Sequence, residues 1–433
     1  MKKTLIASLM LMVMVMAQLT GCSSDDATSG EQEISKTEDS AVVEIRLTSW
    51  GDFTQGDVES LLVEEFNSTH DDIKISFEPL PGDSYGQKLA ANFAAGTACD
   101  IFLIGEGDYS MYHGQGVTTN LNEYFAKSET FDIDAYNKGL ITMATFDGEV
   151  HYLPKDFNPI ALYYNKDMFD ATNLEYPDET WTYEDLERVA KTLTNAEEGT
   201  YGFYADPWLY TTMMYMMTNG ADIGNEDATK AEGYVNSEAA IDAVTRYTNY
   251  ILVDKISPSS SFANDLGGAT SMFQEGKVAM FISGGWNIGT LDTAGANYGT
   301  TAVPMGSTGK HSSIICAAGF AINNKSEHKE EAFEVLEWMS GPEAHAARSA
   351  NSVGILPAFN DQLEAKVAEN PQVAGLAYMM EHAFKPVRMR SITGQYFDEH
   401  FNKALEEILL AGEDVKTALD KAAANIDEAI ADH

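Results

Sequence analysis

A carboxylate, a proline and several aromatic side chains lie in one short segment near the middle of the chain. Segment 202–210 reads Gly-Phe-Tyr-Ala-Asp-Pro-Trp-Leu-Tyr, so Asp206 and Trp208 flank Pro207. Carboxylate oxygens accept hydrogen bonds from hydroxyl groups, and an aromatic ring can cover the apolar C–H face of a sugar. Because Pro207 fixes φ and lacks an N–H, a loop is favoured over a helix interior. The segment indicates polyol binding, although aromatic loops also serve packing.

More polar and aromatic residues follow strand-like segments early in the chain. Segment 42–50 alternates apolar and polar residues, and it begins an order of strand, helix, strand, helix, strand. This order predicts a parallel sheet with helices on its faces, in which ligands bind beyond the carboxyl ends of the strands. We therefore expect Trp50, Asp52, Glu106 and Asp108 at that edge.

A second aromatic candidate follows a strand later in the chain. Segment 278–282 is a short apolar strand, and Gly284 and Gly285 after it allow a close approach of the backbone. We expect Trp286, which comes next, to face a ligand. Trp181, at the start of a helix, is expected to pack in the core.

Local signals predict several further elements. Asp147-Gly148 predicts a hairpin, and Thr182 followed by Asp185 predicts the start of a helix. The methionine-rich segment 209–219 predicts a core helix because it is too short to span a membrane. Segment 314–322 predicts a long strand.

The N-terminus predicts export. Residues 1–21 have a basic start and an apolar run of about seventeen residues, near the lower limit for a membrane span. Leu-Thr-Gly before Cys22 resembles a bacterial lipobox, which favours a signal peptide over a transmembrane anchor. Residues 22–41 are almost free of apolar side chains, so we expect a lipidated flexible tether that holds the protein on the outer face of the cell membrane.

Size and charge limit the remaining possibilities. The body of roughly 390 residues exceeds one ordinary hydrophobic core, which predicts two lobes. A formal net charge of −40 repels phosphate backbones and argues against nucleic-acid binding. Cys99 and Cys316 are expected to be buried thiols, with a disulfide left open, and no histidine pattern near them indicates a metal site. The chain has no phosphate-cradling loop, and we expect no cofactor.

Four segments together resemble the bacterial extracellular solute-binding protein family 1, the substrate-binding lipoproteins of carbohydrate ABC importers, a group that includes maltose-binding protein. They are the lipobox and segments 154–169, 181–186 and 273–286. The resemblance covers essentially the whole mature chain. It implies an α/β fold of the type II periplasmic-binding-protein class, in which two lobes, each a mainly parallel sheet flanked by helices, are joined by hinge strands.

The resemblance also implies lobe boundaries and site residues. The N-terminal lobe would comprise 42–155 with 314–345, and the C-terminal lobe 156–313 with 346–433. Residues that correspond to ligand contacts of the family, or to the loops that carry them, are Trp50, Asp52, Glu106, Asp108, Asn158, Asp206, Trp208, Trp286, Arg388 and Tyr396. Asn158 stands in place of a cleft carboxylate, an exchange that would alter the pattern of hydroxyl groups that the site recognises. Arg388 and Tyr396 lie near the C-terminal aromatic contact of the family.

The family implies a monomer that binds a mono- or oligosaccharide and delivers it to the permease subunits of the importer, without enzymatic activity. A polyamine or another non-sugar solute remains open, because carboxylates with aromatic rings also hold cations. A secreted glycoside hydrolase is the third alternative, but no spacing of carboxylates singles out an acid and a nucleophile.

Overall fold

The fold begins with the residues that follow the predicted tether. The computed structural model describes residues 42–50, 57–81, 84–105, 108–225, 229–313, 315–382 and 393–432. These residues belong to one compact unit that starts at Val42. No helix within these ranges has the length and hydropathy of a membrane span.

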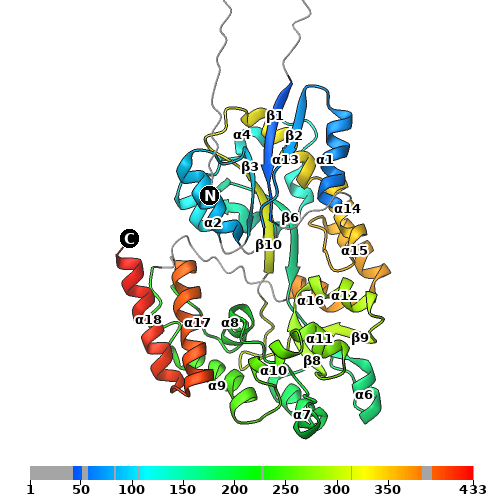
Figure 1. Cartoon of the computed structure of the whole chain (residues 1–433), viewed down its shortest axis with the longest axis vertical. Coiled ribbons are helices and arrows are strands. Elements are labelled where there is room, and N and C mark those ends of the chain that lie inside the picture. The colour runs from blue at the N-terminus through cyan, green and yellow to red at the C-terminus, as the bar shows by residue number, and fades with distance from the viewer. Residues whose placement is uncertain are drawn as a thin grey trace, which may run out of the picture. The chain divides into compact units, whose positions relative to one another are not determined.

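The first sheet has the strand order β2-β1-β3-β10-β6 (Figure 1). Strands β1 (Val43–Thr48), β2 (Ile73–Phe77) and β3 (Ile101–Gly105) are parallel, as their alternation with helices predicts. Strand β10 (Ile315–Ile322) runs antiparallel to β3, and β6 (Leu153–Pro159) runs antiparallel to β10.

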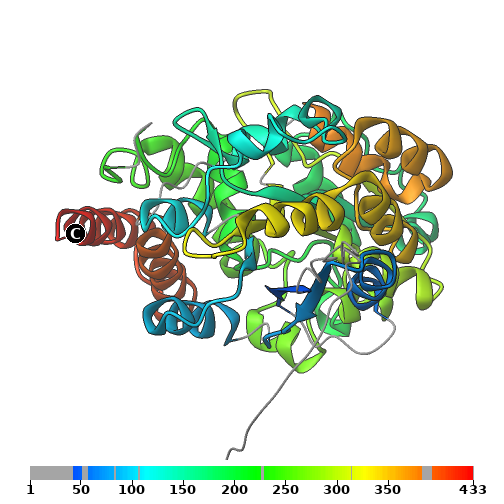
Figure 2. The same ribbon diagram turned by 90° about the horizontal axis from the view of Figure 1, so that it is seen from above.

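Helices cover this sheet and complete its core. The helices are α1 (Val58–Thr69), α2 (Tyr85–Ala95), α13 (Lys329–Ser340) and α14 (Pro342–Asn351). Apolar side chains from strands and helices, with Phe66 among them, form one hydrophobic cluster, called here the first core. Helix α1 contacts α14, and the two lie next to each other in both views (Figure 1, Figure 2).

The second sheet has the order β8-β7-β9, formed by β7 (Ala161–Asn165), β8 (Met280–Ser283) and β9 (Tyr298–Thr301). Both pairs are antiparallel, so the expectation of a mainly parallel sheet in each lobe is wrong for these strands. The physical reason is that a short apolar run buried on both faces reads the same in either direction. A parallel bridge joins Tyr204 to Phe281 at the edge.

Around the second sheet lies a larger cluster, called here the second core. Every residue of helix α8 (Leu209–Thr218) except Tyr210 is buried, which confirms the predicted core helix. The other long helices of this part are α7 (Tyr183–Leu193), α9 (Glu238–Leu252), α15 (Asn360–Glu369), α16 (Ala374–His382), α17 (Thr393–Ala411) and α18 (Val415–Ala431). The shorter ones are α3 (Tyr109–Gly114), α4 (Asn122–Phe125), α5 (Lys138–Ala144), α6 (Lys166–Thr172), α10 (Ser260–Asp265), α11 (Ala269–Gln274) and α12 (Ile288–Thr293).

Two strands run from one core into the other. In β6, Leu153 belongs to the first core and Phe157 to the second. In β10, Phe320 belongs to the first core and Ala317 to the second. Only one residue separates β6 from β7, so the chain enters the second sheet directly from the first.

The predicted local signals are confirmed. The hairpin of β4 (Thr145–Phe146) and β5 (Glu149–Val150) turns through Asp147 and Gly148, with φ of 52° and 85°, the left-handed region that such a turn requires. Thr182 and Asp185 form a reciprocal capping box at the start of α7. Trp181 is 9% exposed and packs in the second core.

Candidate functional site

Two tryptophans from separate loops meet at the surface of the second core. Trp208 precedes α8, and Trp286 lies in the short 3-10 helix Gly285–Asn287 that follows β8. Their ring centroids are 5.9 Å apart, with an interplanar angle of 84°, an edge-to-face arrangement. Trp208 also meets Tyr210 at 5.0 Å. The fold therefore joins the two aromatic segments that the sequence singles out.

Trp286 is unusually open for a tryptophan. Its exposed fraction is 46%, whereas Trp181 is 9% exposed. The indole folds back over its own loop. It lies so close to Gly284 that a Cβ built on this glycine would be 2.1 Å from an indole carbon. Glycine is thus required at 284 to let the ring lie there, and the exposed face remains available to a ligand.

Asn158 on β6 lies beside the same loop. A Cβ on Gly285 would lie 2.7 Å from Asn158 Oδ1 and 2.1 Å from the carbonyl oxygen of Gly354. Asn158 Oδ1 is buried and has no hydrogen-bond partner among the described residues. The position predicted from the resemblance thus lies at the Trp286 loop, with an acceptor oxygen that is not yet satisfied.

The carboxyl of Asp206 has an unusually high pKa. Burial raises the pKa of its carboxyl to about 6, and a hydrogen bond from the backbone of Trp208 offsets only part of this effect. The hydroxyl of Tyr247 donates to the backbone carbonyl of Asp206 at 2.5 Å, which fixes the loop from the core side. A hydroxyl of a ligand that donated to the carboxylate would stabilise its ionised form.

Trp50 and Asp108 lie in the first part of the structure. The Trp50 ring packs against the first core, edge to face with Tyr85 at 5.5 Å. It also lies over Gly105, where an added Cβ would be 3.1 Å from an indole carbon. Asp108 precedes α3 and makes no capping hydrogen bond there. Burial raises its pKa.

Helix α17 adds a carboxyl group that sequence reasoning missed. Burial, followed by the charge of Asp108, raises the pKa of Asp398 to about 6, and Asp398 Oδ1 is buried without a partner in the described ranges. Tyr396, two residues earlier, is partly buried against the second core. A carboxyl inside a helix with an ordinary amphipathic pattern carries no sequence signal that could have revealed it.

Four predicted residues have no structural account. Asp52, Glu106, Arg388 and the lipidation candidate Cys22 lie outside the described residues. Within the described ranges, no three His, Cys, Asp or Glu side chains gather as a metal site. Cys99 is a buried free thiol.

A buried ionic cluster fixes the strand that carries Asn158. Arg348 on α14 donates to both carboxylate oxygens of Glu59 on α1, at 2.8 Å each. Lys155 on β6 lies 3.2 Å from Glu59 Oε1 and 2.7 Å from Asp156 Oδ2. Burial alone would raise the pKa of Glu59, but the charges of Arg348 and Lys155 lower it to about 2.

His345 ties the same strand to α14. Its Nδ1 accepts from the backbone N–H of Ala358 at 3.2 Å, so Nε2 carries the proton and donates to the carbonyl of Pro154 at 3.0 Å. Burial and the nearby charge of Arg348 lower the pKa of His345 to about 3. The ring is therefore neutral at any physiological pH.

The chain is similar in sequence to known solute-binding proteins. The galactooligosaccharide-binding protein of Bacillus subtilis (strain 168) is 26% identical over 341 residues, 76% of this chain and 75% of that protein. An sn-glycerol-3-phosphate-binding periplasmic protein of Rhizobium meliloti (strain 1021) is 26% identical over 400 residues, 86% of this chain and 90% of that protein.

A solved structure of a substrate-binding protein has a similar fold. An ABC substrate-binding protein from Listeria monocytogenes, in complex with cycloalternan, superposes with a TM-score of 0.81 at 25% identity, covering 90% of this chain and 99% of that one. The two-lobed α/β fold class expected from the sequence is thereby confirmed. The profile of bacterial extracellular solute-binding proteins matches residues 50–346, well over half of the sequence. With its fold and its sequence in agreement, the chain belongs to the bacterial extracellular solute-binding protein family.

Proposed function

We propose that the protein binds a mono- or oligosaccharide in a cleft between two lobes and delivers it to the permease subunits of an ABC importer. The observation that carries the proposal is the edge-to-face pair of Trp208 and Trp286, with Asp206 two residues from one of them. The exposed indole face suits the apolar face of a sugar ring, and Asp206 and Asn158 supply acceptors for its hydroxyl groups.

The surroundings of Asp206 and Asn158 favour a neutral ligand over an anionic one. Lys155, the nearest described cation in sequence to Asn158, is already held by Glu59 and Asp156. Anionic ligands need free cations or helix N-termini, and at the nearest N-terminus, that of α8, the carboxylate of Asp206 would repel an anion. The family binds solutes without converting them, and it acts outside the cytoplasm, so the protein is a solute-binding protein rather than an enzyme.

We propose the lobe division that the family resemblance implies. In this division the N-terminal lobe would comprise 42–155 with 314–345, and the C-terminal lobe 156–313 with 346–433. Support comes from β6 and β10, which run from the first core into the second and are the natural hinge strands. Closure about these strands would bring Trp50, Asp52, Glu106 and Asp108 toward Trp208 and Trp286, and Arg388 and Tyr396 would complete the site.

The protein acts as a monomer, anchored by lipid at Cys22 on the outer face of the membrane. The lipobox-like sequence before Cys22 and the polar segment after it support the anchor. Metabolic labelling with a palmitate analogue tests it. The wild-type chain should be labelled and found with membranes, whereas Cys22→Ala should be unlabelled; equal labelling would contradict the anchor.

A thermal-shift screen of the soluble body against a carbohydrate panel tests the ligand class. A sugar at about 100 times its Kd should stabilise the protein by about 2.7 kcal/mol. Calorimetry on each hit then measures affinity at low and high ionic strength. A neutral sugar should show little salt dependence.

The polyamine alternative is tested in the same experiment. Asp206, Asp108 and Asp398 provide carboxyl groups that a cation would stabilise in their ionised forms. Spermidine should therefore be included in the panel. A spermidine affinity that falls steeply with salt, together with no shift from any sugar, would overturn the sugar proposal in favour of the cation.

A further inference from the structure

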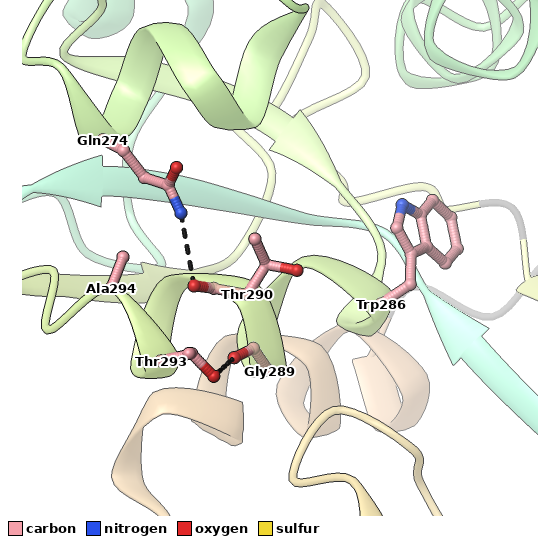
Figure 3. A pocket seen from close by; sticks show the side chains of 6 residues that line it. All are labelled: Gln274, Trp286, Gly289, Thr290, Thr293 and Ala294. Carbon is pink, nitrogen blue, oxygen red and sulfur yellow. Dashed lines mark hydrogen bonds between the residues drawn. The ribbon is translucent and has the colours of Figure 1, made fainter. Parts of the chain in front are cut away.

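An open hollow adjoins Trp286 on the side of α11 and α12. Its volume is about 580 Å³, within the ~300–1,000 Å³ of typical small-molecule pockets. It is lined by Gln274, Trp286, Gly289, Thr290, Thr293 and Ala294 (Figure 3). Sequence reasoning pointed only to Trp286 among these residues.

The lining has the chemistry of a neutral polyol site. It offers an amide, two threonine hydroxyls, methyl groups and an indole, and none of the six residues carries a charge. Gln274 Nε2 donates to the carbonyl of Thr290 at 3.2 Å, which ties α11 to α12. Figure 3 shows the amide oxygen of Gln274 turned away from this bond. That oxygen can accept from a hydroxyl without breaking the tie between the helices.

Trp286 is shared between the hollow and the tryptophan pair. Its ring lies 5.9 Å from Trp208, while its residue forms one end of the hollow. Figure 3 shows the indole extending away from the other lining side chains. A ligand that covers the indole and turns back past the backbone of residue 286 would reach Thr290 and Gln274.

We propose that this hollow is an outer subsite for an additional sugar unit, so that the ligand is an oligosaccharide rather than a monosaccharide. The inference rests on the sugar-binding function proposed above. One sugar unit occupies the region of Asp206 and Trp208, the next stacks on Trp286, and a further unit lies in the hollow. Each additional unit removes apolar C–H surface from water and adds hydrogen bonds to Gln274 or Thr290.

Calorimetry with two series of defined length tests the subsite. The probes are malto-oligosaccharides of one to six units and β-1,4-galacto-oligosaccharides of the same lengths. For the series that binds, affinity should rise about tenfold or more between the disaccharide and the tetrasaccharide, since each tenfold step needs only ~1.4 kcal/mol. Ala294→Trp, which fills the hollow, should remove this gain and reduce the tetrasaccharide affinity to that of the disaccharide.

A matched substitution controls for the added ring. Ala431 is exposed near the end of α18, away from the hollow-lining residues, so Ala431→Trp should preserve the gain with length. Equal affinity for all lengths in the wild type, or an equal loss for short and long sugars in Ala294→Trp, would overturn the subsite while leaving sugar binding intact. Failure of every saccharide in both series and in the carbohydrate panel to bind would overturn the sugar-binding function itself and the subsite with it.

Discussion

Trp208 and Trp286 stand edge to face across two loops that are far apart in the sequence, with 5.9 Å between their ring centroids. The two rings differ in their support. Trp208 is partly buried against the second core, whereas Trp286 is 46% exposed. The pair thus combines a fixed ring with an available one, and this difference allows binding and stability to be separated experimentally.

Trp286→Ala should weaken sugar binding while leaving the apo protein nearly as stable. The exposed ring contributes little to the core, but its loss removes a stacking surface from the ligand. We expect a tenfold to hundredfold loss of affinity, equivalent to about 1.4–2.8 kcal/mol. Calorimetry measures the affinity, and a thermal melt of the apo protein measures stability.

Trp181→Ala is the matched control for this substitution. Trp181 is 9% exposed and packs in the second core, so its truncation should cost about 3–5 kcal/mol of folding free energy. A large drop in apo stability for Trp286→Ala, with unchanged affinity, would return Trp286 to a packing role.

Sugar affinity should rise with pH through about 6. The pKa of Asp206 is raised from 3.8 to about 6 in the free protein, and a hydroxyl donating to the carboxylate would lower it in the complex. Binding therefore releases protons near pH 6 and strengthens as pH rises from 5 to 7. Calorimetry in buffers of different ionisation enthalpy measures the protons released.

The carboxyl of Asp206 has the opposite effect on the folding stability of the apo protein, which it lowers as pH rises. A pKa raised on folding destabilises the ionised form, so its cost is absent below about pH 3.8 and complete above about pH 6. Asp206→Asn should flatten both pH profiles. If the affinity profile persists in this variant, the titrating group is another carboxyl, and Asp398→Asn, at a group whose pKa is also about 6, is the next variant to measure.

Gly285→Ala should impair both folding and binding. The added methyl group would meet the carbonyl oxygen of Gly354 at 2.1 Å and Asn158 Oδ1 at 2.7 Å, so the loop of Trp286 must shift. We expect a lower melting temperature and weaker sugar affinity. Gly86→Ala on α2 is the control, because nothing lies within 4 Å of its Cβ and alanine favours the helix by ~0.5–1 kcal/mol. Equal effects of the two substitutions would contradict the close approach.

Breaking the buried pair of Glu59 and Arg348 should be strongly destabilising. Glu59→Leu leaves the arginine buried without its main partner, which costs about 3–5 kcal/mol. The double variant Glu59→Leu/Arg348→Met removes both charges and should recover part of that loss. Urea unfolding measures each variant, and a double variant no more stable than Glu59→Leu would show that the arginine does not need its partner.

Low pH should lower the folding stability of the wild type, because it protonates Glu59 of the same pair. The pKa of Glu59 is lowered from 4.5 to about 2, so its contribution is present above about pH 4.5 and is lost as pH falls toward 2. Unfolding curves recorded between pH 5 and pH 3 should show this loss in the wild type, and a smaller one in the double variant.

Local sequence signals predict the elements well because their causes are local. The Asp147-Gly148 turn and the capping box of Thr182 and Asp185 each depend on residues close to one another in the chain. The loop of Trp208 follows from Pro207 for the same reason. Strand direction in the second sheet escapes such signals because it depends on where the chain goes between strands.

The assembled site could not be predicted from neighbours in the sequence. Glu59 and Arg348 are 289 residues apart, and their pairing requires α1 and α14 to meet. The contact of Asn158 with Gly285 depends on how β6 lies against the end of β8. Gln274 and Thr290 look like ordinary helix residues in the sequence, and only the packing of α11 against α12 places them around one hollow.

The close approach of Gly285 and Gly354 has a consequence for how such a protein can change its ligand. A Cβ on Gly354 would lie 1.8 Å from the carbonyl oxygen of Gly285, so neither glycine can be replaced without moving the other segment. Gln274, Thr290 and Ala294 are exposed. Mutation can thus revise recognition at these positions one residue at a time, while the loop that presents Trp286 keeps its course.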